Sequence, residues 1–85
     1  MAEVVIYTKD YCPYCVRAKA LLTRKGAMFR EINITHDEGL QKEMVDKSSG
    51  RKTVPQIFIG DKPVGGCDDL YALESAGKLN ALLAG

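Results

Sequence analysis

Two cysteines three positions apart constrain this chain more than any other feature: Cys12 and Cys15 enclose a Pro-Tyr dipeptide. An apolar run at residues 4–7 precedes the pair, and a helical pattern over residues 16–25 follows it. The pair therefore lies where a strand leads into a helix. Pro13 suits the first turn of that helix, where its missing N–H is tolerated. This arrangement predicts Cys12 at the helix N-cap and Cys15 one turn further on.

A cysteine at the start of a helix is chemically unusual. It faces free backbone N–H groups and the positive end of the helix dipole, and both favour the thiolate over the thiol. Lys9 adds a positive charge close by in the sequence. We therefore expect a reactive Cys12 with a pKa below that of an ordinary thiol, and Cys15 as its partner in a disulfide.

The spacing of this cysteine pair is typical of a thioredoxin-like redox motif. A zinc site is a rival interpretation, but zinc needs four ligands. Apart from the pair, the chain offers only Cys67 and His36, at no standard spacing. A purely structural disulfide is a weaker alternative, because so short a loop restricts the unfolded chain very little. We expect no bound metal.

Composition narrows the class of protein. The chain has 85 residues, of which 46% are hydrophobic, which is enough for one modest core and argues against disorder. The net charge of +1 gives no reason to expect a nucleic-acid partner or a membrane surface. Residues 1–3 are not followed by the basic and apolar regions of a signal peptide, so we expect none, and no apolar run approaches a membrane span. An odd number of cysteines is unlike a secreted disulfide framework. We expect one cytoplasmic domain over residues 1–85, acting as a monomer.

Hydrophobic periodicity predicts alternating strands and helices. Thr35 and Glu38 form a capping-box pattern at the start of the second helix. The expected strands cover residues 4–7, 28–34, 56–59 and 63–65, and the expected helices cover residues 13–25, 35–49, 67–76 and 79–83. The order β-α-β-α-β-β-α, with a short helix appended, predicts an α/β fold. Its first two strands are parallel, its last two form a hairpin, and helices cover both faces of a four-stranded mixed sheet.

Two further motifs accompany the cysteine pair: Thr53-Val54-Pro55 and Gly65-Gly66-Cys67-Asp68-Asp69-Leu70. With Cys-Pro-Tyr-Cys they make the chain resemble a dithiol glutaredoxin, most closely the small bacterial ones, over about residues 4–83. The resemblance implies a thioredoxin-like fold. It also implies an enzyme that uses glutathione to reduce protein–glutathione mixed disulfides and protein disulfides, with both kinds of protein as partners.

Several roles follow from the resemblance alone. Cys12 corresponds to the nucleophile and Cys15 to the resolving cysteine of the family. Pro55 corresponds to a proline that is cis in the family. The backbone of Val54, beside Thr53, would pair with the cysteinyl unit of glutathione like an added strand.

The remaining implied roles also concern glutathione. Tyr14 would flank its sulfur. Gly66 would let it approach the backbone, and the N–H groups of Cys67 and Asp68 would hold its γ-glutamyl carboxylate. The Asp68 carboxylate would take its ammonium group. Lys9 would face its glycyl carboxylate. Lys42 lies where relatives carry Gln or Arg for that same carboxylate.

Simpler interpretations of these residues stay open. Asp68 and Asp69 both suit a helix N-cap regardless of any ligand, and exposed lysines such as Lys9 and Lys42 are usually plain surface charges. The Gly65-Gly66 pair is also compatible with a bend alone, and Cys67 with a small buried residue.

Two rival functions also remain at this stage. One is a carrier of an iron–sulfur cluster held by Cys12 and glutathione, against which Pro13 argues. The other is a glutathione-independent reductase of the thioredoxin type, which the motif at residues 65–70 and the lack of tryptophan disfavour.

Overall fold

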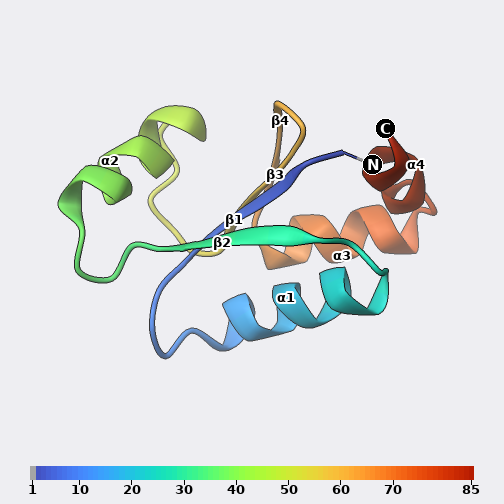
Figure 1. Cartoon of the computed structure of the whole chain (residues 1–85), viewed down its shortest axis with the longest axis horizontal. Helices are drawn as coiled ribbons and strands as arrows, with labels where there is room; N and C mark the ends of the chain where they lie inside the picture. The colour runs from blue at the N-terminus through green and yellow to red at the C-terminus, as the bar shows by residue number, and fades with distance from the viewer. Residues whose placement is uncertain (1) are drawn as a thin grey trace.

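The computed structural model describes residues 2–85 of the chain. The strands and helices are, in chain order, β1 Val4–Thr8, α1 Pro13–Arg24, β2 Phe29–Asn33, α2 Glu38–Lys47, β3 Gln56–Ile59, β4 Lys62–Gly65, α3 Cys67–Ser75 and α4 Leu79–Ala84. Figure 1 shows this alternation of strands and helices along the chain. The predicted order of elements is confirmed.

The four strands form one mixed sheet in the order β2-β1-β3-β4. β1 runs parallel to β2 and antiparallel to β3, so that Ile6 lies opposite Glu31 on one side and Ile57 on the other. β3 and β4 form the expected antiparallel hairpin. The loop after β1, which carries Cys12, is therefore flanked by β2 on one side and by the segment that leads into β3 on the other.

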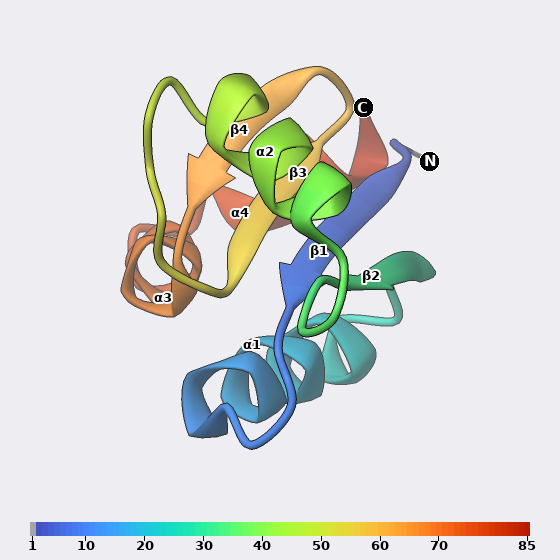
Figure 2. The same ribbon diagram turned by 90° about the vertical axis from the view of Figure 1, so that its left-hand side faces the viewer.

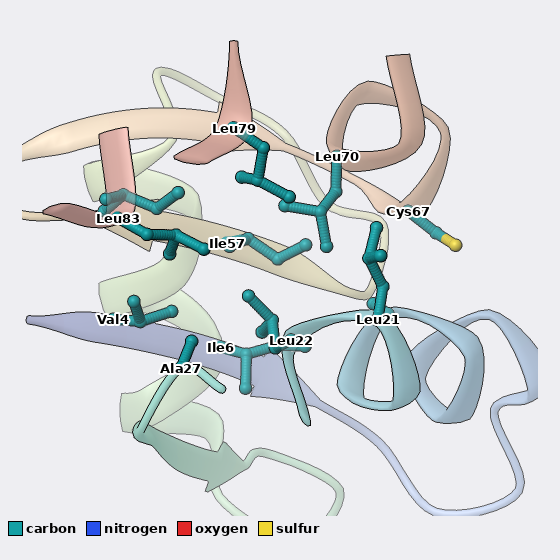
Figure 3. Packing of buried hydrophobic residues seen from close by; sticks show 12 residues of the cluster. Val4, Ile6, Leu21, Leu22, Ala27, Ile57, Cys67, Leu70, Leu79 and Leu83 are labelled. Carbon is teal, nitrogen blue, oxygen red and sulfur yellow. The ribbon is translucent and has the colours of Figure 1, made fainter. Parts of the chain in front are cut away.

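Helices cover both faces of the sheet, as predicted (Figures 1 and 2). Alternation along β1 sends Val4 and Ile6 to the face covered by α1, α3 and α4. Figure 3 shows this cluster, to which α1 contributes Leu21 and Leu22 and α3 contributes Leu70. This larger core packs α1 and α3 against each other.

A smaller core lies on the other face, beneath α2. It consists of Tyr7, Ile34, Met44 and Phe58. The rings of Tyr7 and Phe58 pack edge to face, with their centroids 5.7 Å apart. β1 is therefore buried on both sides, as its continuous apolar run predicts.

The start of α2 differs from the prediction. Asp37 is the N-cap, and its carboxylate accepts a hydrogen bond from the Leu40 N–H at 2.9 Å. The capping box expected from Thr35 and Glu38 is wrong. The Thr35 hydroxyl is engaged elsewhere, because it donates to Asn33 Oδ1 and accepts from the Asp10 N–H. The helix consequently begins at Glu38, within the range expected from the sequence.

Within the described residues 2–85, no helix is both long enough and apolar enough to cross a membrane.

Tyr7 gives the smaller core a pH dependence. Its hydroxyl donates to Glu43 Oε2 at 2.6 Å, and burial together with this carboxylate raises the pKa of Tyr7 from 10.0 to about 12. Because the folded state holds this proton more tightly than the unfolded state, the contribution of Tyr7 is fully present below pH 10 and is lost as pH rises towards 12.

Between pH 8 and pH 11 we therefore expect the free energy of unfolding to fall in both proteins. The fall in the native protein should exceed the fall in Tyr7→Phe by about 1.4 kcal/mol. Urea unfolding of both proteins at the two pH values measures the difference, in which the other alkaline titrations cancel. Equal losses would show that Tyr7 ionises normally.

Candidate active site

The cysteine pair has the helix-start geometry that the sequence predicts. Cys12 is the N-cap of α1, with φ −111° and ψ 101°, and Pro13 is the first helical residue. The Sγ atom of Cys12 accepts a hydrogen bond from the Cys15 N–H at 3.1 Å. The two Cα atoms are 5.2 Å apart, and the sulfurs lie at disulfide distance. Cys12 thus occupies a position that stabilises a thiolate.

The two cysteines differ in exposure. Cys12 is partly exposed, whereas Cys15 is buried with 2% of its surface exposed. An incoming disulfide therefore meets the sulfur of Cys12 first. The buried sulfur of Cys15 lies next to the sulfur of Cys12, so Cys12 is the group with which it is placed to react.

The loop before β3 faces this pair. The Val54–Pro55 peptide bond is cis, as the resemblance implies. The carbonyl oxygen of Val54 lies 3.9 Å from Cys12 Sγ. Pro55 is buried, whereas Thr53 beside it is exposed. The backbone of this loop thus borders the sulfur of Cys12.

A cleft of about 480 Å³ opens beside this loop. We call it the Pro55 cleft; its lining residues are Tyr14, Arg51, Thr53, Val54, Pro55, Gly66, Cys67, Asp68 and Asp69. In Figure 2 the segment that leads into β3 passes close to the start of α3, where the last four of these residues lie. The cleft thus brings together three motifs that are far apart in the sequence.

The start of α3 is built by Asp69. Gly66 is the N-cap, and its N–H donates to Asp69 Oδ2 at 2.8 Å. Asp68 is not used in this way and is exposed at the cleft. The helix start therefore offers both an exposed carboxylate and a helix dipole to a ligand in the cleft.

Arg51 is a cleft residue that sequence reasoning missed. Its guanidinium Nη1 lies 3.3 Å from Asp69 Oδ2, which holds the side chain at the cleft. Arg51 lies in the loop after α2, outside any motif, and only the tertiary fold brings it to α3. A lone arginine in a loop gave no signal that would have singled it out.

Two predicted lysines lie outside this cleft. Lys9 lines a separate groove on the β2 side of the cysteine loop. Lys42 lies on α2, where its Nζ pairs with Asp46 Oδ2 at 3.0 Å and its side chain is 78% exposed. Neither is among the residues that line the Pro55 cleft. Their roles towards glutathione stay predictions.

Arg17 also has a tertiary role that its exposed helical position did not suggest. Its guanidinium lies 6.0 Å from the ring centre of Tyr14 and 5.4 Å from that of Tyr71. The hydroxyl of Tyr71 in turn donates to the Arg17 carbonyl oxygen. This contact links α1 to α3 beside Tyr14, at the edge of the cleft.

The third cysteine is buried at the first position of α3, as an unreactive small residue would be. Burial raises the pKa of the Cys67 thiol above its usual value. Cys67 is therefore protonated near neutral pH and a poor nucleophile. Among residues 2–85, no group of three or more His, Cys, Asp or Glu residues is placed to hold a metal ion.

A cysteine pair at a strand–helix junction, facing a cis-proline on this mixed sheet, defines a thiol–disulfide oxidoreductase of thioredoxin-like fold. The family described as Glutaredoxin matches residues 4–64. Glutaredoxin 3 of Escherichia coli is 58% identical over 83 residues, which cover 98% of this chain and 99% of that protein. The chain belongs to the glutaredoxin family, and it is a glutathione-dependent disulfide oxidoreductase.

Solved structures agree with this assignment. The solution structure of a glutaredoxin from Brucella melitensis is 61% identical, with a TM-score of 0.86, and the match covers 98% of this chain and 89% of that one. A buckwheat glutaredoxin in complex with glutathione is 34% identical, with a TM-score of 0.88 over 98% of this chain and 77% of that one.

The geometry of Cys12 predicts its acidity in the reduced protein. Because the sulfur accepts the Cys15 N–H at a helix start, we expect a pKa well below the ordinary value of about 8.5. Thiolate absorbance followed against pH in Cys15→Ser measures it, since Cys67 is buried. A depressed pKa stabilises the reduced folded protein above the unfolded-state value, and the gain fades as pH falls through the folded-state pKa. A midpoint near 8.5 would contradict the expectation.

Proposed function

We propose that Cys12 is the nucleophile and Cys15 the resolving cysteine of this glutathione-dependent reductase. The observation that carries the proposal is the contrast between the two sulfurs. Cys12 is partly exposed at the helix N-cap beside a ligand-sized cleft, whereas Cys15 is buried behind it. Only Cys12 is accessible to an incoming disulfide.

The proposed reaction with a glutathionylated protein has two exchanges. The Cys12 thiolate attacks the sulfur of glutathione, and the protein cysteine leaves as a thiolate. A second glutathione thiolate then attacks the glutathione sulfur held on Cys12, which forms oxidised glutathione and returns the Cys12 thiolate. An acidic Cys12 assists this second exchange, because a thiol of low pKa is a better leaving group.

We propose that glutathione binds in the Pro55 cleft. The backbone of Val54 beside Cys12 supports pairing with the cysteinyl unit, as an added strand pairs with a sheet edge. The start of α3 supports binding of the γ-glutamyl carboxylate by the N–H groups of Cys67 and Asp68. The exposed carboxylate of Asp68 is suited to the ammonium group.

The two carboxylates of glutathione need positive partners. Arg51 lies at the cleft and is oriented by Asp69 beside the start of α3, which supports it as a partner of the γ-glutamyl carboxylate. Lys9 and Lys42 are the partners that the family resemblance implies for the glycyl carboxylate. We propose that both contribute their charge at longer range, where the interaction depends on ionic strength.

This division predicts unequal effects of charge substitutions. Arg51→Gln should raise the Michaelis constant for glutathione about tenfold, the lower end of what loss of one charged hydrogen bond costs. Lys42→Glu should raise it by a smaller factor, and only at low ionic strength. Steady-state kinetics of both variants at low and high salt separate the two residues. An unchanged Michaelis constant for glutathione in Lys42→Glu at low salt would show that Lys42 is only a surface charge.

One comparison tests the function as a whole. Reduction of the same protein disulfide is measured side by side with glutathione plus glutathione reductase and with thioredoxin reductase. We expect turnover with glutathione and little with thioredoxin reductase; the reverse would identify a reductase of the thioredoxin type. A purified protein with a strong visible absorbance would instead favour the iron–sulfur carrier.

We further propose that the 85-residue chain acts as one domain, as a monomer in the cytoplasm. A reducing compartment suits an enzyme whose cysteine pair must be returned to the thiol form. Sedimentation at a mass of 9.3 kDa tests the oligomeric state.

A further inference from the structure

A second groove opens on the other side of the cysteine loop. It has a volume of about 550 Å³, and Tyr11, Cys12, Pro13, Val16, Lys19 and Glu31 are among the residues that line it. Because β1 lies between β2 and β3, this groove is on the β2 side of Cys12, and the Pro55 cleft is on the β3 side. We call it the β2-side groove. Cys12 thus has one hollow on each side.

Tyr11 lines this groove and has an unusual backbone conformation. Its φ is +56°, in the left-handed region that an aromatic residue rarely adopts, and its side chain is fully exposed. Ser49 is also left-handed, but it lies in the turn that ends α2, where such a conformation is common. Tyr11 comes just before the start of α1 and not after the end of a helix, so helix termination does not explain its left-handed backbone. A strained backbone that presents an aromatic ring beside the nucleophile points to a role in binding.

The groove offers apolar contact more than net charge. Val16, on the first turns of α1, is 61% exposed and lies in the groove with Tyr11. The charged residues that line the groove, Lys9, Asp10, Lys19 and Glu31, carry no net charge, and Lys19 Nζ on α1 lies 3.1 Å from Glu31 Oε2 on β2. The buried Thr8 hydroxyl also donates to Glu31 at 2.7 Å. Balanced charges beside exposed apolar side chains favour an apolar group as the occupant.

The position of the groove identifies what that group belongs to. Glutathione carries only one residue on each side of its cysteine, and under the proposed function it binds in the Pro55 cleft with Lys9 contributing charge at longer range. A client polypeptide joined to Cys12 through its cysteine continues beyond that length, so it needs contacts outside the Pro55 cleft. Cys12 itself lines the second groove. The groove is therefore the adjoining surface for a client chain that is longer than glutathione.

We propose that the β2-side groove binds the segment of a client protein next to its reactive cysteine, and that it favours an apolar side chain there. The inference rests on the proposed function and adds a preference among protein disulfides. In that reaction the Cys12 thiolate attacks one client sulfur, and the other client cysteine leaves as a thiolate. Cys15 then attacks the Cys12 sulfur, which releases the first client cysteine and closes the Cys12–Cys15 disulfide. Two glutathione molecules reduce that disulfide and become oxidised glutathione.

The test uses two synthetic peptides, each closed by one disulfide. They are identical except that the residues flanking the cysteines are Leu in one and Ser in the other. Rates with dithiothreitol correct for any difference in intrinsic reactivity. We expect the native protein to prefer the Leu peptide about tenfold in kcat/KM, the effect of partly burying one aliphatic side chain.

Tyr11→Asn removes the ring but keeps a residue that tolerates the left-handed backbone. We expect this variant, and separately Val16→Ser, to reduce the preference to about twofold or less. Both should keep the native rate with the mixed disulfide of glutathione and β-mercaptoethanol, which has no client chain. Met28→Asn is the matched control, because Met28 is an exposed apolar residue outside the groove and should keep the full preference.

The outcomes separate the two proposals. No preference in the native protein, or an unchanged preference in both groove variants, would overturn the groove assignment while the glutathione reaction stands. An equal loss on the peptides and on the small mixed disulfide would also overturn it, because Tyr11 would then act on Cys12 rather than on the client. No glutathione-dependent turnover of the small mixed disulfide by the native protein would instead refute the proposed function.

Discussion

Cys12→Ser should abolish thiol transfer, whereas Cys15→Ser should keep the removal of glutathione from mixed disulfides largely intact. A serine hydroxyl is not ionised near neutral pH and does not attack sulfur. Serine is nevertheless a favourable N-cap, so α1 should still form. The Cys15 variant keeps the one thiol that deglutathionylation requires, since external glutathione performs the second exchange.

The same Cys15 variant should lose most of its reduction of client protein disulfides. There the tethered Cys15 attacks the mixed disulfide at a high effective concentration that free glutathione does not match. Both variants are measured in both assays, with Cys67→Ser as the control, because that buried thiol is expected to contribute to neither. A Cys15 variant inactive in deglutathionylation, or an active Cys12 variant, would show that the nucleophile is assigned wrongly.

Gly65→Ala should lower the free energy of unfolding. It should also raise the Michaelis constant for glutathione, because it displaces side chains that line the Pro55 cleft. Gly65 has a φ of +112°, which strains any residue with a Cβ atom. That Cβ would also overlap the Asp69 carboxylate and the Arg51 guanidinium. Both side chains can swing away, but Asp69 then stops accepting the Gly66 N–H and α3 loses its N-terminal hydrogen bond. Strain and the lost cap together should lower the free energy of unfolding by about 2 kcal/mol.

Gly26→Ala is the matched control for this substitution. Gly26 also has a positive φ, of 73°, but nothing lies within 4 Å of a Cβ built there. It should lose about 1 kcal/mol from strain alone and keep the native Michaelis constant for glutathione. Urea unfolding and steady-state kinetics measure both variants. Equal losses of stability, with no change in the Michaelis constant for Gly65→Ala, would show that the cap of α3 does not depend on this glycine.

The details of individual elements show where sequence reasoning was limited. The start of α2 is one example, because Thr35 and Asp37 are both good N-cap residues. Only the contacts of Thr35 with Asn33 and Asp10 decide between them. Asp68 and Asp69 posed the same ambiguity. The structure gives the backbone hydrogen bond to Asp69 and leaves Asp68 exposed.

Features that depend on neighbouring residues could be predicted from the amino-acid sequence. The apolar run of β1, the proline after Cys12 and the glycines after the helices set the elements and their order. They also placed Cys12 at a helix start, because N-cap chemistry is local. The cis bond and the roles in binding glutathione came from resemblance to a family.

Contacts between residues from distant segments became visible only in the folded protein. The tertiary structure brought Arg51 to Asp69, set Arg17 between two tyrosines, left Lys42 on an outer face of α2 and opened a second groove beside Tyr11. The physical reason is that such contacts depend on how helices pack on the sheet. Side chains from several elements set that packing together, and no local pattern encodes it.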